Sequence, residues 1–174
     1  LRMGLIFDIK RYAINDGPGI RITIFMKGCP LSCVWCHNPE GLSSRKQKLY
    51  TKKKCIGCRT CVDNCPQKAL SLTPDGVVTD RSLCDLCGKC AELCPAMAME
   101  ISGTEYSIDY LIHEIEKETV FMDRSEGGVT FCGGEPLQHP DMLLEMLRRC
   151  GELGIHRAVD TTLLAVPEVV RKVM

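Results

Sequence analysis

The cysteines of this chain form a repeat, and that repeat constrains the fold more than any other feature. The segments CIGCRTCVDNCP (55–66) and CDLCGKCAELCP (84–95) share their cysteine and proline positions at an offset of 29 residues. Each is followed by a short apolar tail, QKALSL or AMAMEI. Cysteines so closely spaced suit metal better than a framework of disulfides. Residues 49–100 are therefore predicted to form a compact, internally duplicated metal-binding module.

Each half of the repeat is a C-x-x-C-x-x-C-x-x-x-C-P run, which resembles that of the bacterial two-cluster ferredoxins. In such a run three thiolates hold one cube and the fourth reaches the other. The predicted ligand sets are Cys55, Cys58, Cys61 and Cys94 for one 4Fe-4S cluster, and Cys84, Cys87, Cys90 and Cys65 for the second. Zinc is the alternative, although two C-x-x-C pairs would suffice for one zinc ion. Because four thiolates saturate each cube, the expected function is electron relay.

The flanking segments alternate between strand and helix patterns. The predicted strands are residues 20–28, 127–136 and 155–163, and the predicted helices are residues 107–122, 140–154 and 166–174. This order favours an α/β fold with a parallel sheet, or part of a barrel. The cysteine module interrupts it after the first strand. The predicted domains are residues 1–48 as the first part of the α/β domain, residues 49–100 as the insert and residues 101–174 as the continuation.

A second cysteine pattern has no fourth member. The loop GCPLSCVWCHNPEG (28–41) places Cys29, Cys33 and Cys36 at C-x-x-x-C-x-x-C spacing. If these three bind a 4Fe-4S cube, one iron keeps an open position, as metal sites that do chemistry commonly do. The loop follows a predicted strand, and parallel α/β folds place their active sites at the carboxyl ends of strands. A reactive cluster is therefore expected here.

These motifs together carry a family resemblance. The three-cysteine loop, with Trp35 before its last cysteine, is similar to the radical S-adenosylmethionine motif, and GGEP (133–136) resembles the motif that contacts the methionyl amino group. With DGPGIR (16–21) they resemble the glycyl-radical-enzyme activating enzymes, of the pyruvate formate-lyase activating enzyme type. The ferredoxin-like insert resembles the subgroup that serves dehydratases, decarboxylases and other lyases.

The resemblance implies a partial (β/α) radical-SAM barrel with an inserted two-[4Fe-4S] ferredoxin-like domain. It implies reductive cleavage of S-adenosylmethionine to a 5′-deoxyadenosyl radical, which abstracts a hydrogen from a glycine Cα of a partner glycyl radical enzyme. The implied cofactors are three [4Fe-4S] clusters, S-adenosylmethionine and a monovalent cation. A low-potential electron donor such as flavodoxin or ferredoxin is the second implied partner, in an anaerobic setting.

The resemblance also assigns roles to residues. Cys29, Cys33 and Cys36 would hold the cluster that cleaves S-adenosylmethionine; Trp35, Cys36 and His37 would line the adenosyl group; Gly133, Gly134 and Glu135 would form the methionyl site; Asp160 and Thr161 would bind the cation. Leu163 departs from the pattern, because relatives often have a glycine there. Relatives also continue with an Asp-x-Lys segment and a later histidine. The chain is therefore expected to be C-terminally truncated and weak or inactive alone.

The composition of the chain argues against some classes of function. Acidic and basic side chains balance to zero formal net charge, which gives no support for nucleic-acid or membrane binding. The sequence contains no long apolar run and no signal-peptide pattern, and its odd count of thirteen cysteines indicates a reducing, cytoplasmic compartment. Two alternatives stay open: a radical S-adenosylmethionine enzyme acting on another peptide or small molecule, and a non-catalytic iron–sulfur electron-transfer protein. The substrate of the partner enzyme is not encoded in these motifs.

Overall fold

The structure, a computed structural model, describes residues 3–174 and contains two compact units. Unit 1 comprises the residues up to Arg45 together with Gly103–Met174, and unit 2 comprises Lys46–Ser102. The boundaries of unit 2 lie two or three residues outside the predicted insert. The reason is local, because two paired strands at the ends of the insert begin at Gln47 and end at Ser102.

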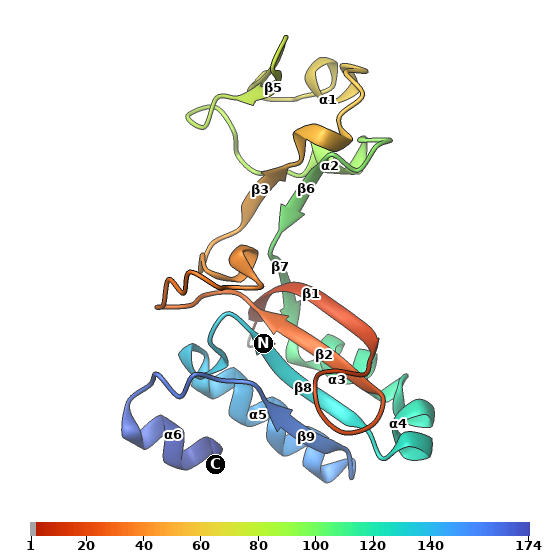
Figure 1. Cartoon of the computed structure of the whole chain (residues 1–174), viewed down its shortest axis with the longest axis vertical. Helices are drawn as coiled ribbons and strands as arrows, with labels where there is room; N and C mark the ends of the chain where they lie inside the picture. The colour runs from red at the N-terminus through yellow and green to blue at the C-terminus, as the bar shows by residue number, and fades with distance from the viewer. Residues whose placement is uncertain (1–2) are drawn as a thin grey trace. The chain divides into compact units, whose positions relative to one another are not determined.

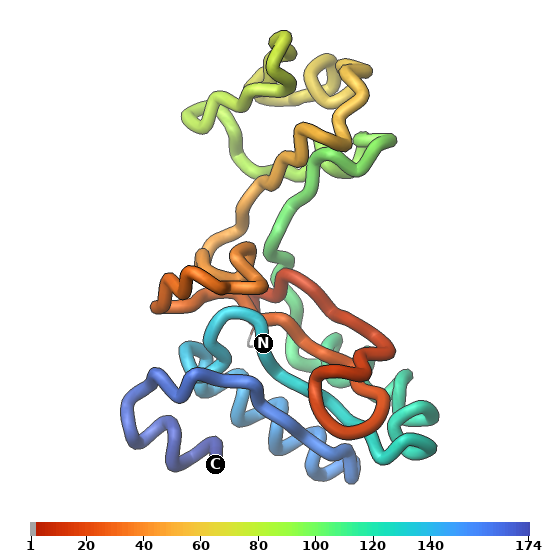
Figure 2. Tube along the Cα trace, viewed as in Figure 1, coloured from red at the N-terminus to blue at the C-terminus, as the bar shows by residue number. Residues whose placement is uncertain are grey.

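Unit 1 is built on a five-stranded sheet with the order β7-β1-β2-β8-β9 (Figure 1). Its strands are β1 (Met3–Ala13), β2 (Arg21–Met26), β7 (Thr104–Ser107), β8 (Gly128–Gly133) and β9 (His156–Val159). The three predicted strands are confirmed as β2, β8 and β9, which pair in parallel. In the trace of Figure 2 the orange β2, the teal β8 and the blue β9 follow one another across the sheet.

The sheet also contains two strands that the sequence did not predict. β1 pairs antiparallel with both β2 and β7. Its pairing with β2 shifts register between Ile6 and Asp8 and again between Lys10 and Ala13. Each shift breaks the alternation of buried and exposed side chains, which is the signal by which a strand is recognised in a sequence.

Helices cover one face of this sheet. They are α3 (Ile108–Glu116), α4 (Thr119–Ser125), α5 (Pro140–Glu152) and α6 (Pro167–Val173). Ser107 caps α3 by accepting a hydrogen bond from the Tyr110 N–H at 3.1 Å. The predicted single helix 107–122 is divided between α3 and α4, because the chain leaves the helix at Lys117 and Glu118, where the Glu118 N–H bonds the Ile115 carbonyl three residues back.

The core of unit 1 is the contact between these helices and the sheet. Apolar residues recur at helical spacing on α3 and α5 and at every second position on β2 and β8. They are Leu111, Ile112, Ile115, Leu143, Met146, Cys150, Ile22, Ile24, Val129 and Phe131, all buried. The opposite face of the sheet therefore carries the alternate side chains, which include Arg21, Thr23, Thr130 and Cys132.

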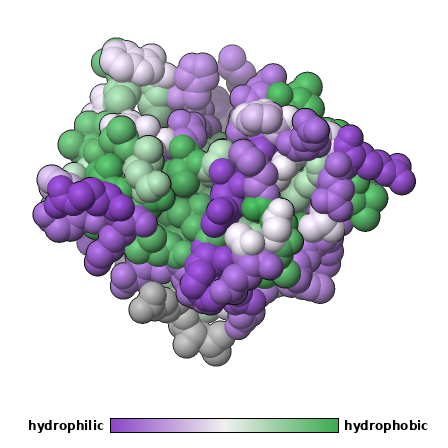
Figure 3. All heavy atoms as spheres, turned by 90° about the horizontal axis from the view of Figure 1, so that it is seen from below, coloured by the Kyte–Doolittle hydropathy of each residue, from purple (hydrophilic) through white to green (hydrophobic). Residues whose placement is uncertain are grey.

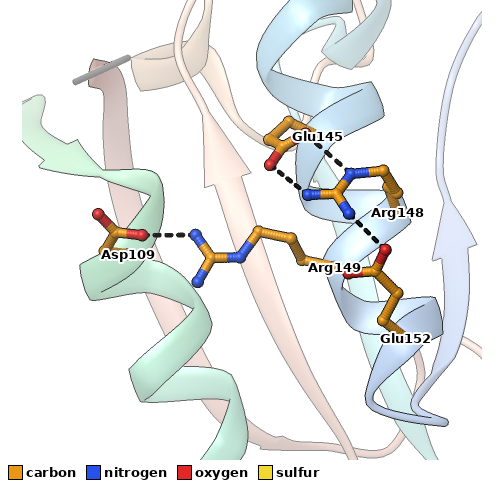
Figure 4. Close-up of polar contacts among 5 residues, drawn as sticks. All are labelled: Asp109, Glu145, Arg148, Arg149 and Glu152. Carbon is orange, nitrogen blue, oxygen red and sulfur yellow. Dashed lines mark hydrogen bonds and ion pairs between the residues drawn. The ribbon is translucent and has the colours of Figure 1, made fainter.

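Charged side chains join α3 and α5 at the surface (Figure 4). Arg149 pairs with Asp109 across the two helices, and Arg148 pairs with Glu145 and Glu152 along α5. Exposed ion pairs of this kind contribute little to stability. The buried apolar contacts beneath them therefore hold the two helices together.

The sequence repeat of unit 2 is also a structural repeat. Strands β3 (Gln47–Tyr50) and β6 (Met99–Ser102) pair antiparallel, as do β4 (Leu70–Thr73) and β5 (Gly76–Thr79). The short helices α1 (Thr60–Asp63) and α2 (Lys89–Glu92) each follow a residue in the left-handed conformation, Arg59 or Gly88. A single-turn 3-10 helix spans Lys52–Lys54. The duplicated cysteine run therefore forms two copies of one turn–helix–strand motif.

The surface is mixed in character. Seen from below, hydrophobic side chains gather in the middle of the face and hydrophilic ones border them (Figure 3). Among the helices of residues 3–174, none has the length and apolar character needed to cross a membrane.

Candidate functional site

Three loops with predicted site residues leave the same edge of the sheet in unit 1. The three-cysteine loop follows β2, Gly134 and Glu135 follow β8, and Asp160 and Thr161 follow β9. Because these strands are parallel neighbours, their carboxyl ends lie side by side. Residues far apart in the sequence are thus brought to one place.

The three-cysteine loop closes on itself at its base. The Gly28 N–H donates to the Gly41 carbonyl at 2.7 Å, and the Cys29 N–H donates to the Leu42 carbonyl at 3.0 Å. Between them the chain makes a short 3-10 helix, Pro39–Gly41. The loop therefore starts and finishes at a fixed point beside the end of β2.

The loop after β8 is bonded to this base. The Gly134 N–H donates to the Met26 carbonyl at 2.7 Å, and the Glu135 N–H donates to the Gly28 carbonyl at 2.8 Å. The chain then turns through a 3-10 helix, Pro136–Gln138. Main-chain hydrogen bonds therefore hold the GGEP segment against the base of the cysteine loop.

This close approach explains the two glycines of GGEP. A Cβ on Gly134 would lie 2.4 Å from the Gly28 carbonyl oxygen and 2.8 Å from that of Gly41. Gly133 has φ of +111°, and its Cβ would lie 2.6 Å from the Met26 nitrogen. Glycine is therefore required by the packing of backbone on backbone, a reason separate from the predicted approach of a ligand.

The three thiols of the loop are half-buried. Cys29, Cys33 and Cys36 are free, and the Cys36 N–H donates to the Cys33 carbonyl at 3.1 Å. Trp35 is 73% exposed and His37 is also exposed. The three thiols are thus accessible to an incoming iron–sulfur cube, and the aromatic side chain beside them lies open. Across residues 3–174, no three His, Cys, Asp or Glu side chains converge closely enough to hold a single metal ion.

In unit 2 the cysteines surround two cavities. Cavity A, partly open to solvent, is lined by Cys55, Cys58, Cys61 and Cys94. Cavity B, also partly open, is lined by Cys65, Cys84, Cys87 and Cys90. Each cavity thus gathers the four cysteines that were assigned to one cluster, including the fourth cysteine contributed by the other half of the repeat.

The thiols of unit 2 differ in acidity. Burial raises the pKa of the Cys61 and Cys90 thiols, whereas hydrogen bonds with Thr60 lower the pKa of the Cys58 thiol. Iron binds thiolates, so loading these cavities releases protons.

Two families match these parts of the chain. Residues 54–98 match the family described as a 4Fe-4S dicluster domain, and residues 15–73 match the family described as a 4Fe-4S single cluster domain. The first match covers the cysteines of both cavities, and the second includes the three-cysteine loop.

Curated relatives match nearly the whole chain. The isethionate sulfite-lyase activating enzyme of Oleidesulfovibrio alaskensis is 41% identical over 163 residues, 91% of this chain and 53% of that enzyme. The indoleacetate decarboxylase activating enzyme of Tractidigestivibacter scatoligenes is 41% identical over 180 residues, 98% of this chain and 57% of that enzyme. The trans-4-hydroxy-L-proline dehydratase activating enzyme of Clostridioides difficile is 42% identical over 158 residues, 90% of this chain and 52% of that enzyme.

This chain is a homologue of the glycyl-radical-enzyme activating enzymes. It spans about half the length of the curated relatives it matches.

In this activating-enzyme homologue, Glu135 has a role that its motif did not reveal. The side chain is fully buried. Its Oε1 accepts hydrogen bonds from the Leu137 N–H at 3.0 Å and the Thr161 hydroxyl at 2.5 Å. Its Oε2 accepts from the Thr162 N–H at 2.8 Å and the Thr162 hydroxyl at 2.6 Å. The carboxylate therefore fastens the loop after β8 to the loop after β9. Thr162, which was not predicted, belongs to the site for this reason.

The proposed cation residues lie on the loop after β9. The Asp160 N–H donates to the Phe131 carbonyl at 2.9 Å, and the Asp160 side chain is exposed. The Thr161 hydroxyl donates its proton to Glu135. Leu163 has φ of +61°, a left-handed conformation that favours glycine. The backbone at this position is therefore strained for leucine.

Two further residues of this site, Lys27 and His139, were not predicted from the sequence. Lys27 is fully buried, its ammonium donates to the Glu40 carbonyl, and burial lowers its pKa. The His139 Nε2 bonds the Lys27 carbonyl at 2.6 Å. The His139 side chain thus braces the start of the cysteine loop, and the Lys27 side chain braces its end. They were missed because each contact joins segments that are distant in sequence.

The DGPGIR segment of the homologue folds onto the polar face of the sheet. The Asp16 carboxylate accepts from the Thr23 hydroxyl, and the Asp16 carbonyl accepts from the Thr130 hydroxyl, both at 2.7 Å. The buried Arg21 donates to the Pro18 carbonyl at 2.9 Å. These bonds give the segment a structural role.

Proposed function

We propose that this protein is a radical S-adenosylmethionine activating enzyme that installs a glycyl radical in a partner enzyme. The observation that best supports this proposal is that hydrogen bonds join the cysteine loop, the GGEP segment and the loop after β9 at one edge of the sheet. The homology to activating enzymes of a lyase, a decarboxylase and a dehydratase supports the same reaction class. The parallel strands β2, β8 and β9 and their helices are consistent with part of a (β/α) radical-SAM barrel.

The residues present fit the cluster that this function needs. Cys29, Cys33 and Cys36 are free, half-buried thiols on one closed loop, and together they supply three ligands for a cube that has four iron corners. When bound there, such a cluster would supply the electron that cleaves S-adenosylmethionine into methionine and the radical that abstracts hydrogen from a glycine. The exposed Trp35, with His37, would line the adenosyl group.

The rest of the site positions the ligand. The Glu135 carboxylate already accepts hydrogen bonds from three neighbouring residues, so a methionyl amino group would meet the main-chain carbonyls of the GGEP segment instead. Gly133 and Gly134 let that backbone pack closely against the base of the cysteine loop. Asp160 and the Thr161 oxygen would bind a monovalent cation beside the carboxylate of the ligand.

Unit 2 would relay electrons to that site. Each cavity offers four cysteines, which is the full complement for one 4Fe-4S cluster, so we expect three clusters in all. A low-potential donor such as flavodoxin or ferredoxin would supply the electrons. The thirteen free thiols suit a reducing cytoplasm.

The test is anaerobic incubation of the reconstituted protein with candidate partners of the kinds that the relatives' names give, isethionate sulfite-lyase, indoleacetate decarboxylase and trans-4-hydroxy-L-proline dehydratase, together with dithionite and S-adenosylmethionine. We expect a glycyl doublet in the electron paramagnetic resonance (EPR) spectrum of the partner, and its absence with Cys33→Ala. Cleavage of S-adenosylmethionine without the doublet would favour a different peptide or small-molecule target. Assembled clusters without cleavage would favour an electron-transfer protein.

A further inference from the structure

The two cavities of unit 2 differ at several lining positions, which include Arg59 in cavity A and the half-buried Lys48 in cavity B. Lys48, on β3, lines cavity B together with its four cysteines, and Ile101, its partner across to β6, lines the same cavity. The Lys48 ammonium donates a hydrogen bond to the Thr79 hydroxyl on β5. The charged group is half-buried, and its partner Thr79 lies in an adjoining open pocket with Arg81 and Cys84, one of the cysteines of cavity B.

The internal repeat shows what stands at the matching position of cavity A. Val77 follows Lys48 at the repeat offset of 29 residues, and Thr79 follows Tyr50 at the same offset. Cavity A is lined by Val77 and Tyr50, and the Val77 N–H donates to the Tyr50 hydroxyl at 3.1 Å. Where cavity A has an apolar valine, cavity B therefore has an ammonium group.

Other charges near cavity B are more exposed. Asp85 lines the cavity, but its carboxylate is solvent-exposed and accepts from the Cys87 N–H and from Gln67. Lys89 also lines it and forms an ion pair with Glu92. The partner of the Lys48 ammonium is a neutral hydroxyl, so its charge is less screened by water and counter-charge than either of these.

We propose that Lys48 raises the reduction potential of the cluster held in cavity B. The inference rests on the proposed function, in which Cys65, Cys84, Cys87 and Cys90 hold that cluster. On reduction the cluster takes one electron from the external reductant, no bond forms or breaks, and the reduced site carries one more negative charge. A fixed ammonium beside the site favours that state. Burial raises the pKa of the Cys90 thiol and the Lys48 charge opposes that rise, which agrees with the proximity of the two groups.

The experiment is a dithionite titration with redox mediators, followed by EPR, on the 174-residue chain reconstituted with iron and sulfide. The parent carries Cys29→Ala, Cys33→Ala and Cys36→Ala, so that only cavities A and B hold clusters. Lys48→Met is compared with Lys48→Arg, which keeps the charge, and with Lys54→Met. Lys54 is the matched control, because it is an exposed lysine nearby that pairs with Glu100.

We expect Lys48→Met to make one of the two clusters about tenfold harder to reduce, which is about 59 mV for a one-electron couple, and to leave the other unchanged. Lys48→Arg and Lys54→Met should titrate like the parent. Thr79→Val should shift the same cluster in the same direction by less, because the ammonium loses its anchor.

Full iron loading with unchanged titrations in both Lys48→Met and Lys48→Gln would overturn the inference and leave the proposed function standing. A shift of equal size in Lys54→Met would also overturn it, because the effect would then be one of net charge. Failure of the parent to assemble clusters would instead overturn the assignment of cavities A and B as cluster sites, and the inference with it.

Discussion

Glu135 shows how a single buried side chain organises the site at the scale of residues. Its carboxylate accepts hydrogen bonds from Leu137, Thr161 and Thr162, and so joins loops that follow two different strands. Hydrogen bonds to a buried charged group are among the stronger ones in proteins. The positions of Asp160 and of the GGEP backbone therefore depend on this carboxylate.

Glu135→Gln should destabilise unit 1 by about 2–4 kcal/mol, because the amide nitrogen replaces an acceptor and faces donors in a buried position. Urea unfolding of the reconstituted chain measures the change. Glu168→Gln is the control, since that carboxylate is exposed and pairs only with Arg171 along α6, and it should change the midpoint little. Equal stability of the two variants would contradict the role assigned to Glu135.

Cys150 links stability to pH through its burial. Burial raises the pKa of the Cys150 thiol to about 12, above its value of about 8.5 in an unfolded chain. The neutral thiol therefore stabilises the fold fully below about pH 8.5, and this contribution falls as the pH rises toward 12, by about 1.4 kcal/mol per pH unit.

Cys150→Ala should be less stable than the wild type at pH 8, because it leaves a cavity in the core of unit 1. The difference should narrow as the pH rises from about 9 to about 10.5, since only the wild type loses the contribution of the thiol. Urea unfolding across this range tests the expectation. Parallel pH profiles for the two proteins would show that the thiol does not titrate as its burial requires.

At the scale of elements, a polar contact holds the DGPGIR loop against the sheet. The Thr130 hydroxyl on β8 accepts from Arg21 Nε and donates to the Asp16 carbonyl, each at 2.7 Å. Both Thr130 and Arg21 are buried. The loop between β1 and β2 is thus fixed by strand β8.

Thr130→Val keeps the shape of the side chain and removes both hydrogen bonds. We expect a loss of about 2–4 kcal/mol in the free energy of unfolding, because a buried guanidinium N–H and a carbonyl lose their partner. Hydrogen exchange should also quicken at the amides of residues 14–20. Thr119→Val is the control, since its hydroxyl bonds a helix carbonyl at the surface. Unchanged exchange in Thr130→Val would contradict the anchoring.

The sequence predicted those elements whose signals are local. Cysteine spacing grouped the cysteines of unit 2 as the two cavities gather them, and apolar periodicity identified β2, β8, β9 and α5. β1 escaped prediction because two register shifts break its alternation. The bond from Thr162 to Glu135 escaped because it depends on the parallel pairing of β8 and β9, which no short motif encodes.

At the scale of the whole molecule, the chain enters unit 2 through β3 and leaves it through β6, and these two strands pair with each other. Gln47 and Ser102 are register partners on β3 and β6, so the two ends of the insert lie side by side. Unit 1 also has its own core, formed between the sheet and α3 and α5. The insert can therefore be removed without separating the segments that it connects.

Replacement of residues 46–102 by a short glycine-rich turn should leave unit 1 folded. The circular dichroism spectrum should retain its helical signal, and the iron content after reconstitution should fall to about a third, because one cluster of the proposed three remains. A chain that unfolds or aggregates would show that unit 1 depends on the insert. Unchanged iron content would contradict the assignment of clusters to cavities A and B.

The central claim is that the cluster on Cys29, Cys33 and Cys36 has an open iron at which S-adenosylmethionine binds. The most direct measurement is the EPR spectrum of the reduced, reconstituted chain with and without S-adenosylmethionine, compared with the Cys29→Ala, Cys33→Ala, Cys36→Ala variant. We expect S-adenosylmethionine to change the EPR spectrum of the wild type. It should not change the spectrum of the variant, because cysteines saturate the two clusters that remain there. An unchanged spectrum in the wild type, or the same change in the variant, would contradict this claim.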